Sequence, residues 1–245
     1  MLIHADVKSL ELVTAAFLSR DAVLCEEIRT GADIHENNKK RFGFPERRIA
    51  KIFVFRILYG GQAGGFANSS LFNSISQSKS YWQEVIDEFY AKYKGIHSWH
   101  ENLVGTVLDE GRLVLPSGRV YNFDRADVAR RTWFWRSKIL NYPVQGLGAD
   151  VVAIGRVTLW KRLNKAGYPV LFVATVHDSI DLDLDDRGLD KPKEVCYNVM
   201  VCVRNSIIDI PTNFERLFGV PFDLPVGSEI GYGQTLGTLK EFNIE

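Results

Sequence analysis

The sequence predicts an α+β fold in which an antiparallel sheet carries a large helical insertion. Candidate strands lie near both ends of the chain, at 2–5, 169–184 and roughly 222–230, whereas helical patterns fill the middle. Strands and helices that are segregated along the sequence are typical of α+β architecture. The chain has 245 residues and 46% hydrophobic content, which is enough to bury a core as one large domain or two lobes.

The elements expected before residue 61 are a short strand and a series of helices. Short side chains that accept hydrogen bonds favour helix starts, because they can bind the free backbone N–H groups of the first turn. Proline also suits the first turn, because it has no N–H group that would remain unpaired there. Gly31 and Gly43 are typical of helix ends. The expected strand covers 2–5 and ends at Asp6, and the expected helices begin at Ser9, Asp21, Asp33 and Pro45.

The second half of the chain predicts a similar mixture. The stretch 61–76 is rich in Gly, Ser and Asn and predicts a loop or broken helices. Alternating apolar residues on both sides of Pro116-Ser117-Gly118 predict a hairpin over 112–123. The remaining expected elements are helices over 78–110 (broken near Gly95), 143–167 and about 190–208, and two strands over 169–184 that meet at His177-Asp178-Ser179.

Charge is balanced overall but segregated along the chain. The formal net charge is zero, so any electrostatic attraction to nucleic acid must be local. Residues 36–60 contain seven cations and two acids, whereas 181–190 contains five aspartates and one arginine. The three cysteines have neither metal-type spacing nor a disulfide framework, which predicts free thiols in a reducing compartment. The sequence shows neither a membrane-spanning run nor a signal-peptide pattern.

The segment 46–61 predicts a helix with one chemically divided face. Its side chains at every fourth position form a stripe about 18 Å long, because a helix turns by about 100° and rises about 1.5 Å per residue. The stripe begins with cations and ends with aromatic rings, which suits the phosphates and then the sugar and base of a nucleoside triphosphate. An amphipathic helix with solvated cations is the alternative interpretation. The stripe consists of Arg47, Lys51, Phe55 and Tyr59.

Two aspartates stand at predicted strand ends. Asp6 follows the first strand, and Asp178 lies at the tip of the hairpin over 169–184. If these strands are neighbours, the two carboxylates converge and could hold Mg²⁺. Two such ions, roughly 3.5–4 Å apart, can clamp the attacking and leaving oxygens of a phosphoryl transfer. The alternative is structural, with Asp6 capping the next helix and Asp178 serving as a turn residue.

Taken in order along the chain, these segments resemble family A DNA polymerases, the DNA polymerase I and phage type. The match spans almost the whole chain, and the ordered set is far more specific than any single motif. The resembling segments are 5–21 (motif A, with Asp6 and Glu11), 32–43 (the Asp-x-His segment), 47–61 (motif B), 139–152 (with Asn141 and Gln145) and "VHDS" at 176–179 (motif C).

The resemblance implies a template-directed DNA polymerase that uses two Mg²⁺ ions. Asp6 and Asp178 would bind the ions, and Lys51 would donate a proton to the departing pyrophosphate. The implied nucleotide contacts are Arg47, Lys51 and His35 at the phosphates, Phe55 at the sugar and base, Tyr59 near the templating base, and Glu11 at the sugar 2′ position. The implied DNA contacts are Asn141 and Gln145 in the minor groove and His177 near the primer terminus.

The resemblance also implies a partial right-hand polymerase, with an antiparallel palm sheet and a helical fingers insertion. The palm would comprise 1–22 and 136–245, and the fingers 23–135, with thumb and exonuclease domains absent. We therefore expect a shortened form or one half of a split polymerase that extends primers poorly alone. The expected partners are primer–template DNA, dNTP and a second polypeptide that supplies the thumb and remaining palm. The expected location is the cytoplasm of a bacterial or phage-infected cell.

One departure from the family pattern affects the acidic residues. Ser179 stands where motif C usually has Glu, and Asp181 is an alternative third acid if the hairpin is regular. Three rival functions remain: a single-subunit RNA polymerase, which Glu11 and Phe55 argue against; a non-enzymatic replisome or DNA-binding subunit; and, more weakly, a nuclease.

Overall fold

The computed structural model describes residues 1–242, which divide into two compact units. The first, here called the sheet unit, comprises Met1–Glu11 and the described residues from Leu147 onward, and the second, the helical unit, comprises Leu12–Gly146. The division falls within two helices, α1 (Leu10–Ser19) and α9 (Thr132–Ala166). Each unit is described by itself below.

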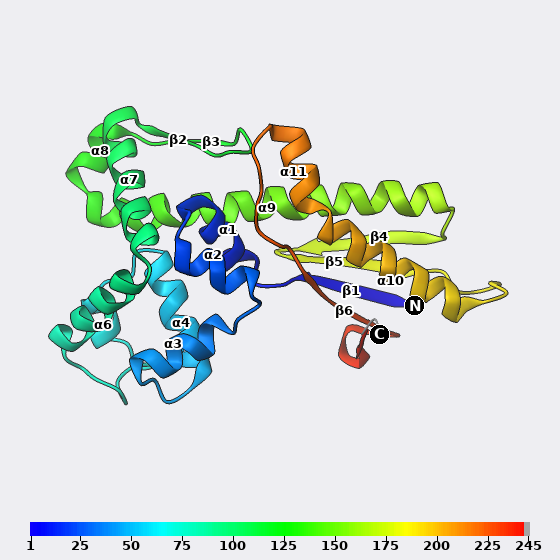
Figure 1. Ribbon diagram of the computed structural model, residues 1–245, viewed down its shortest axis with the longest axis horizontal. Helices are drawn as coiled ribbons and strands as arrows, with labels where there is room; N and C mark the ends of the chain where they lie inside the picture. Colours follow the sequence, from blue (N-terminus) through cyan, green and yellow to red (C-terminus); the bar gives the residue numbers. More distant parts are fainter. Residues whose placement is uncertain (243–245) are drawn as a thin grey trace. The chain divides into compact units, whose positions relative to one another are not determined.

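The sheet unit is built on an antiparallel sheet, as the strand patterns predict (Figure 1). The strand order is β4-β5-β1-β6-β7, so the N-terminal strand lies in the middle. β1 pairs with β5 on one side and with β6 on the other. The strands are β1 (Leu2–Val7), β4 (Val170–Val176), β5 (Ser179–Leu184), β6 (Ser228–Gly233) and β7 (Lys240–Glu241).

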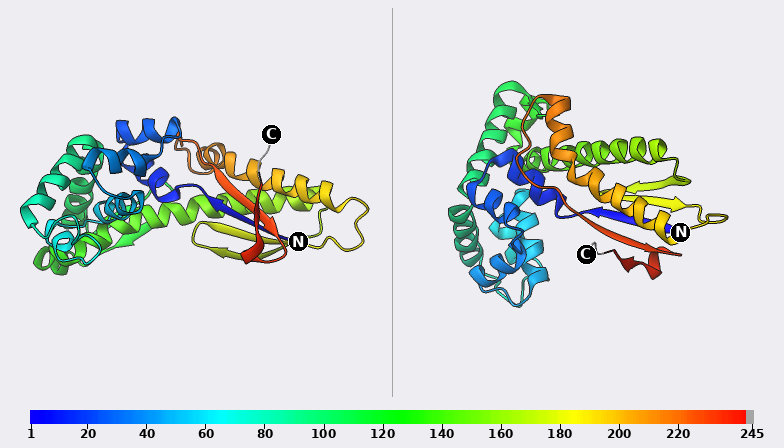
Figure 2. Two further views of the ribbon diagram at one scale, coloured as in Figure 1. Left: turned by 90° about the horizontal axis from the view of Figure 1, so that it is seen from below. Right: turned by 45° about the vertical axis from the view of Figure 1, so that its right-hand side comes forward.

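Alternation along β1 separates an apolar face from a polar one. Ile3, Ala5 and Val7 are buried, whereas His4 and Asp6 are half-buried on the opposite face. Helix α10 (Pro192–Ile208) contacts β1 and β6, and Figures 1 and 2 show it lying along the sheet. The shorter α11 (Ile210–Phe218) follows α10 directly, and the 3₁₀ turn η1 (Leu236–Thr238) precedes β7.

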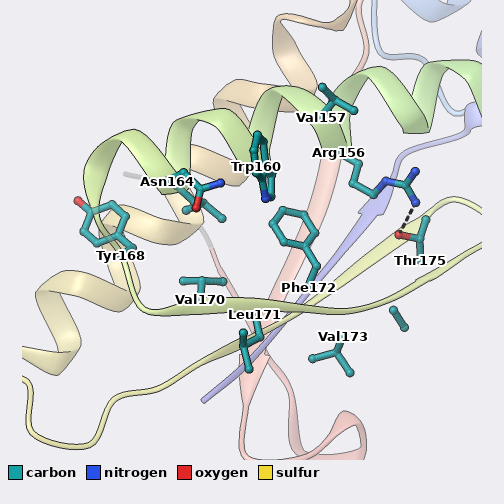
Figure 3. A pocket seen from close by; sticks show the side chains of 12 residues that line it. Arg156, Val157, Trp160, Asn164, Tyr168, Val170, Leu171, Phe172, Val173 and Thr175 are labelled. Carbon is teal, nitrogen blue, oxygen red and sulfur yellow. Dashed lines mark hydrogen bonds between the residues drawn. The ribbon is translucent and has the colours of Figure 1, made fainter.

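A cavity of about 740 Å³, lined by both polar and apolar side chains, lies between the C-terminal half of α9 and the edge strand β4 (Figure 3). The Trp160 indole extends from α9 toward the Phe172 ring of β4, as Figure 3 shows. Trp160 remains 55% exposed and Leu171 70% exposed. Across the mouth, the Arg156 guanidinium donates a hydrogen bond of 3.4 Å to the Thr175 hydroxyl.

The helical unit holds most of the remaining helices and a separate hairpin. The hairpin strands pair antiparallel around the predicted Gly118 turn. The elements are α2 (Ala22–Arg29), α3 (Ile34–Phe42), α4 (Arg47–Leu58), α5 (Ala63–Ala67), α6 (Lys79–Lys92), α7 (Lys94–Glu110), β2 (Arg112–Val114), β3 (Val120–Asn122) and α8 (Arg125–Arg130).

Aromatic packing forms the core of the helical unit. Phe53 of α4 is fully buried, and its ring centroid lies within about 6 Å of several others. Such ring pairs add packing energy beyond the area that they bury. The rings around Phe53 are Phe42, Phe44, Phe66, Trp82 and Phe89. This core fixes α4, and with it the predicted stripe on the other side of the helix.

Several predicted boundaries are wrong. α9 begins at Thr132 rather than 143, because Pro143 lies inside the helix instead of in its first turn. α8 and α11 were not predicted, since both are short. The last predicted strand, 222–230, lies instead at Ser228–Gly233, because Phe222, Leu224 and Val226 are buried without joining the sheet. The break between α6 and α7 falls at Tyr93, close to Gly95, so the break predicted there is confirmed.

Candidate functional site

The structure brings Asp6 and Asp178 together at one end of the sheet. Asp6 lies in β1 directly opposite Ser179 of β5. Asp178 occupies the two-residue turn that joins β4 to β5, and its backbone carbonyl accepts a hydrogen bond of 3.0 Å from the Val7 amide. The turn is thereby tied to the strand that carries Asp6, so that the two carboxyl groups become neighbours.

Burial and the proximity of the two carboxyl groups raise the pKa of Asp6. Burial makes the largest contribution, followed by the negative charge of Asp178 and a hydrogen bond between the two side chains. Two carboxylates this close repel each other, and a cation or a shared proton relieves that repulsion. The geometry is therefore suited to holding a divalent cation.

The turn that presents Asp178 is strained. His177 precedes it with a φ of 54°, a left-handed conformation that non-glycine residues seldom adopt. Backbone strain of this kind costs of order 1–3 kcal/mol and persists where the surroundings hold it in place. Here the carbonyl of Asp178 is held by β1, and the Ser179 hydroxyl donates a 3.0 Å hydrogen bond to the carbonyl of Val176.

The polar face of the sheet contains residues that the sequence did not single out. His4 lies opposite Asp181, and its Nδ1 is 2.6 Å from the Asp181 carboxylate. Asp181 therefore lies on the same face as Asp6, but His4 engages it. Glu229 of β6 lies opposite Asp6 on the other side. Among residues 1–242 no three His, Cys, Asp or Glu side chains form a metal cluster, which leaves the Asp6–Asp178 pair as the candidate centre.

Helix α4 carries the predicted stripe in the helical unit. Arg47 begins the helix, and its Nε donates a hydrogen bond of 2.8 Å to the carboxylate of Asp33, the N-cap of α3. Lys51 is exposed, with its ammonium 5.8 Å from the centre of the Phe55 ring. The role of Asp33 as the partner of Arg47 was not predicted, since Asp33 had been interpreted as a helix cap alone.

His35 lies beside the cationic end of the stripe and is held neutral. The residue is only 6% exposed, and its ring is 5.6 Å from that of Phe55. Burial, followed by the positive charges of Arg47 and Lys51, lowers the pKa of His35 to about 4. Its Nδ1 is buried without a hydrogen-bond partner among the described residues. A buried nitrogen without a partner, next to two cations, is suited to contact an anion.

The aromatic end of the stripe meets the first half of α9. Gln145 donates a hydrogen bond of 2.8 Å from its amide to the hydroxyl of Tyr59. Asn141 precedes Gln145 by one turn on the same helix, and it is half-buried. Gly60, with a φ of 80°, ends α4 in the left-handed conformation that glycine tolerates. A side chain at Gly60 would lie 3.1 Å from Leu140, so the glycine also allows α9 to approach.

The remaining predicted residue, Glu11, lies in the first turn of α1, where a negative charge stabilises the helix N-terminus. The predicted residues thus form two groups. Asp6, His177 and Asp178 gather in the sheet unit; Arg47, Lys51, Phe55 and His35 gather in the helical unit, together with Tyr59 and Gln145.

Acidification should destabilise the fold, because the structure keeps two histidines neutral. Burial is the main cause that lowers the pKa of His35 to about 4 and that of His100 to about 3, against 6.5 for the ordinary side chain. The unfolded chain therefore binds protons first as the pH falls below 6.5, and stability present above that pH is lost. We expect the free energy of unfolding to fall by about 1 kcal/mol per histidine and pH unit between pH 6 and 5.

Urea unfolding at pH 7, 6 and 5 measures this dependence. The variants His35→Gln and His100→Gln should each make the free energy of unfolding depend less steeply on pH, by the contribution of one proton. An unchanged slope in both variants would show that other groups cause the acid sensitivity.

The comparisons with known proteins agree with this architecture. Residues 1–223 match the family model described as "DNA polymerase family A". DNA polymerase I of Streptococcus pneumoniae TIGR4 is 30% identical over 217 residues, which are 82% of this chain and 24% of that protein. DNA polymerase I of Pseudomonas aeruginosa PAO1 is 26% identical over 239 residues, 91% of this chain and 25% of that protein. The chain thus spans about a quarter of the length of these relatives.

A solved structure shares the fold. The POL domain of Pol1 from M. smegmatis, in complex with DNA primer–template and dNTP, superimposes with a TM-score of 0.79 at 23% identity, over 96% of this chain and 39% of that one. The mixed helical and antiparallel-sheet fold is therefore that of a polymerase domain. With the family match spanning residues 1–223, the chain belongs to DNA polymerase family A, and the resemblance found in the sequence is confirmed. No helix within residues 1–242 is long and apolar enough to cross a membrane.

Proposed function

We propose that this chain forms part of the catalytic core of a template-directed DNA polymerase, which transfers dNMP from dNTP to a primer 3′-hydroxyl and releases pyrophosphate. The observation that carries the proposal is the meeting of Asp6 and Asp178 at neighbouring strand ends in a family A chain. The partners are primer–template DNA and dNTP, in line with the ligands of the M. smegmatis complex. The bacterial DNA polymerase I relatives support a location in the bacterial cytoplasm.

In this proposal the palm comprises residues 1–22 and 136–245, and the fingers comprise 23–135. The relatives extend far beyond the matched region, since this chain covers 24–25% of their length. The thumb and the remaining palm would accordingly come from polypeptide outside these residues, either joined to them or separate. Activity would depend on that polypeptide.

Two Mg²⁺ ions are the proposed cofactor, and the donor set fits them. Asp6 and Asp178 offer oxygen ligands. Burial raises the pKa of Asp6 most, and the negative charge of Asp178 adds a repulsion that a divalent cation would remove. Mg²⁺ commonly binds through one or two carboxylates, with waters and substrate phosphates completing its coordination. When bound, the ions would neutralise charge on the attacking and leaving oxygens.

The cations of α4 would hold the triphosphate. Arg47 pairs with Asp33 while half exposed, so exchanging that carboxylate for a phosphate is sterically open and replaces one anion by another. Lys51 is exposed and can approach the phosphates and donate a proton to pyrophosphate, which Arg47 cannot do, because arginine does not give up its proton. The unpartnered nitrogen of buried His35 would gain a phosphate oxygen as its partner.

The other predicted residues would recognise the sugar, the base and the DNA. Phe55 would pack on the nucleotide, Tyr59 would lie near the templating base, and Glu11 would screen the sugar 2′ position. Asn141 and Gln145 would contact the minor groove, where the acceptors are nearly the same for every base pair. His177 would lie near the primer terminus. The hydrogen bond between Tyr59 and Gln145 supports a shared role for these two residues.

Single-nucleotide incorporation tests the function directly. The chain is mixed with primer–template and one dNTP in Mg²⁺, with and without the polypeptide that supplies the thumb. We expect addition of the complementary dNMP only, slow for the chain alone and faster with the added polypeptide. Equal use of ribonucleotides would favour an RNA polymerase. No incorporation under either condition would favour a non-enzymatic subunit.

Replacing Lys51 by methionine should slow incorporation by about 10²-fold, because both a phosphate contact and a proton donor are lost. Arg48→Met is the matched control, since Arg48 is an exposed cation of the same helix that lies outside the stripe, about 60° around the helix from Lys51. The control should stay within about threefold of the wild type. Equal losses in both variants would show that α4 contributes only general positive charge.

A further inference from the structure

An exposed pair of aromatic rings lies at the start of α9, outside the proposed nucleotide site. Trp133 is 75% exposed and Phe134 is 42% exposed, and their ring centroids are 6.0 Å apart. Burying two such rings would be favourable, because it removes a large apolar area from water. Contiguous aromatic surface left in water marks a site of interaction more often than a lone exposed residue does.

Cations surround the two rings. The guanidinium of Arg131 lies 5.2 Å from the centre of the Phe134 ring, and the ammonium of Lys138 lies 5.1 Å from the same ring. Lys138 also lies 4.4 Å from the ring of Trp135. The segment 125–138 contains five cations and a single acid, Asp127. A chain of zero net charge thus places a strongly basic, aromatic patch at this point.

The patch stands on a rigid base. The Trp135 indole donates a hydrogen bond of 2.8 Å to Asp127, and its ring packs against Phe123 and the buried cluster that includes Val128. Asp127 also accepts hydrogen bonds from Arg131, which fixes that guanidinium beside Phe134. The exposed rings are therefore presented by a fixed helix, which lowers the entropic cost of binding.

The aromatic patch lies close in space to Gly60. This glycine directly follows Tyr59, the residue proposed to lie near the templating base. Gly60, directly after Tyr59, lies within 4 Å of Arg136, Ser137 and Leu140 of α9, as measured from the position that a Cβ would take. Trp133 precedes Arg136 by three residues, or about 4.5 Å along the helix. A strand that leads to Tyr59 would thus pass close to the exposed rings.

We propose that Trp133 and Phe134 form a stacking platform for unpaired bases of single-stranded DNA, namely the template strand ahead of the position being copied. Every base has a π-face, so stacking on aromatic rings tolerates any sequence, and nearby cations bind the phosphates. A polymerase must accept any base sequence in its template strand, so a sequence-independent contact suits this role. The inference rests on the proposed function for the identity of the strand, and on the patch alone for the preference for unpaired bases.

Fluorescence anisotropy with labelled DNA tests the platform. The probes are one primer–template duplex with an unpaired 5′ template overhang of thymidines and the same duplex with a blunt end. The wild type should bind the overhang probe more tightly than the blunt one. Trp133→Ala should weaken binding to the overhang probe by about tenfold and leave the blunt probe unchanged, as expected for the loss of one base stack.

Two further variants separate stacking from general damage. Trp133→Phe keeps a ring and should retain most of the preference for the overhang. Trp160→Ala removes another exposed indole, in the cavity beside β4, and should change neither affinity. Equal binding of both probes by the wild type, or an unchanged preference in Trp133→Ala, would overturn the platform. If the wild type prefers the overhang but incorporates no nucleotide even with the polypeptide that supplies the thumb, the platform stands and the proposed polymerase function fails.

Discussion

Replacing Asp178 by asparagine is expected to slow nucleotide incorporation by at least about 10³-fold. The amide keeps the shape of the side chain but removes a charge from the centre that would hold the divalent ions. Metal ions contribute several kcal/mol to stabilising a phosphoryl-transfer transition state, and each 1.36 kcal/mol corresponds to about tenfold in rate. The rate is measured by rapid quench under single-turnover conditions, with any polypeptide that activity requires.

The fold of this variant should be intact or slightly more stable. The Asp178 charge helps to raise the pKa of Asp6, so removing it relieves a repulsion in the folded state. The matched control is Asp183→Asn in the same hairpin, where a half-exposed carboxylate pairs with the chain amino group at 3.4 Å. We expect the control to keep its rate within about twofold, because exposed ion pairs contribute little. A full rate in Asp178→Asn would remove this carboxylate from the chemistry.

Replacing Lys92 by methionine is expected to destabilise the protein by about 3 kcal/mol, because the change leaves a buried carboxylate without its partner. The Lys92 ammonium donates hydrogen bonds to Glu27 at 2.9 Å, to Asn38 at 3.1 Å and to the Tyr93 hydroxyl at 2.6 Å. The side chains of Lys92 and Glu27 are only 12% and 13% exposed. Burial and the charge of Glu27 raise the pKa of Tyr93, so its hydroxyl remains a donor to Glu27.

Urea unfolding of matched variants checks this expectation. Arg41→Met removes a cation from an exposed pair with Glu88, and it should cost less than about 1 kcal/mol. Adding Glu27→Gln to Lys92→Met should recover much of the loss, because the unpaired charge disappears. If Lys92→Met were no more destabilising than Arg41→Met, the hydrogen bonds of Lys92 with Glu27, Asn38 and Tyr93 would not contribute to the stability of the fold.

Local signals in the sequence were sufficient for the elements that carry the candidate site. Asp21 and Asp33 cap α2 and α3 through their side chains as predicted, because capping depends on neighbours three residues away. The position of Asp178 in a tight turn also follows from local signals. The meeting of Asp6 and Asp178, in contrast, requires β1 and β5 to be neighbours, which the strand patterns left open and the family resemblance implied.

The features that the sequence could not predict depend on distant partners. The hydrogen bond between His4 and Asp181 joins residues 177 positions apart and requires the register of β1 and β5. The pairing of Arg47 with Asp33 depends on how α3 meets α4. Pro143 misled the prediction of α9, because local preference places proline at a helix start while the surrounding contacts allow it inside.

The central claim is that the Asp6–Asp178 pair binds the metal ions that accompany a nucleotide. Calorimetric titration of dATP into the chain, in Mg²⁺ and again in EDTA, tests this claim without requiring catalysis. We expect Mg²⁺ to tighten dATP binding at least tenfold in the wild type, as about 1.4 kcal/mol of added interaction would. Asp6→Asn and Asp178→Asn should each abolish this gain. A gain of equal size in both variants, or none in the wild type, would contradict it.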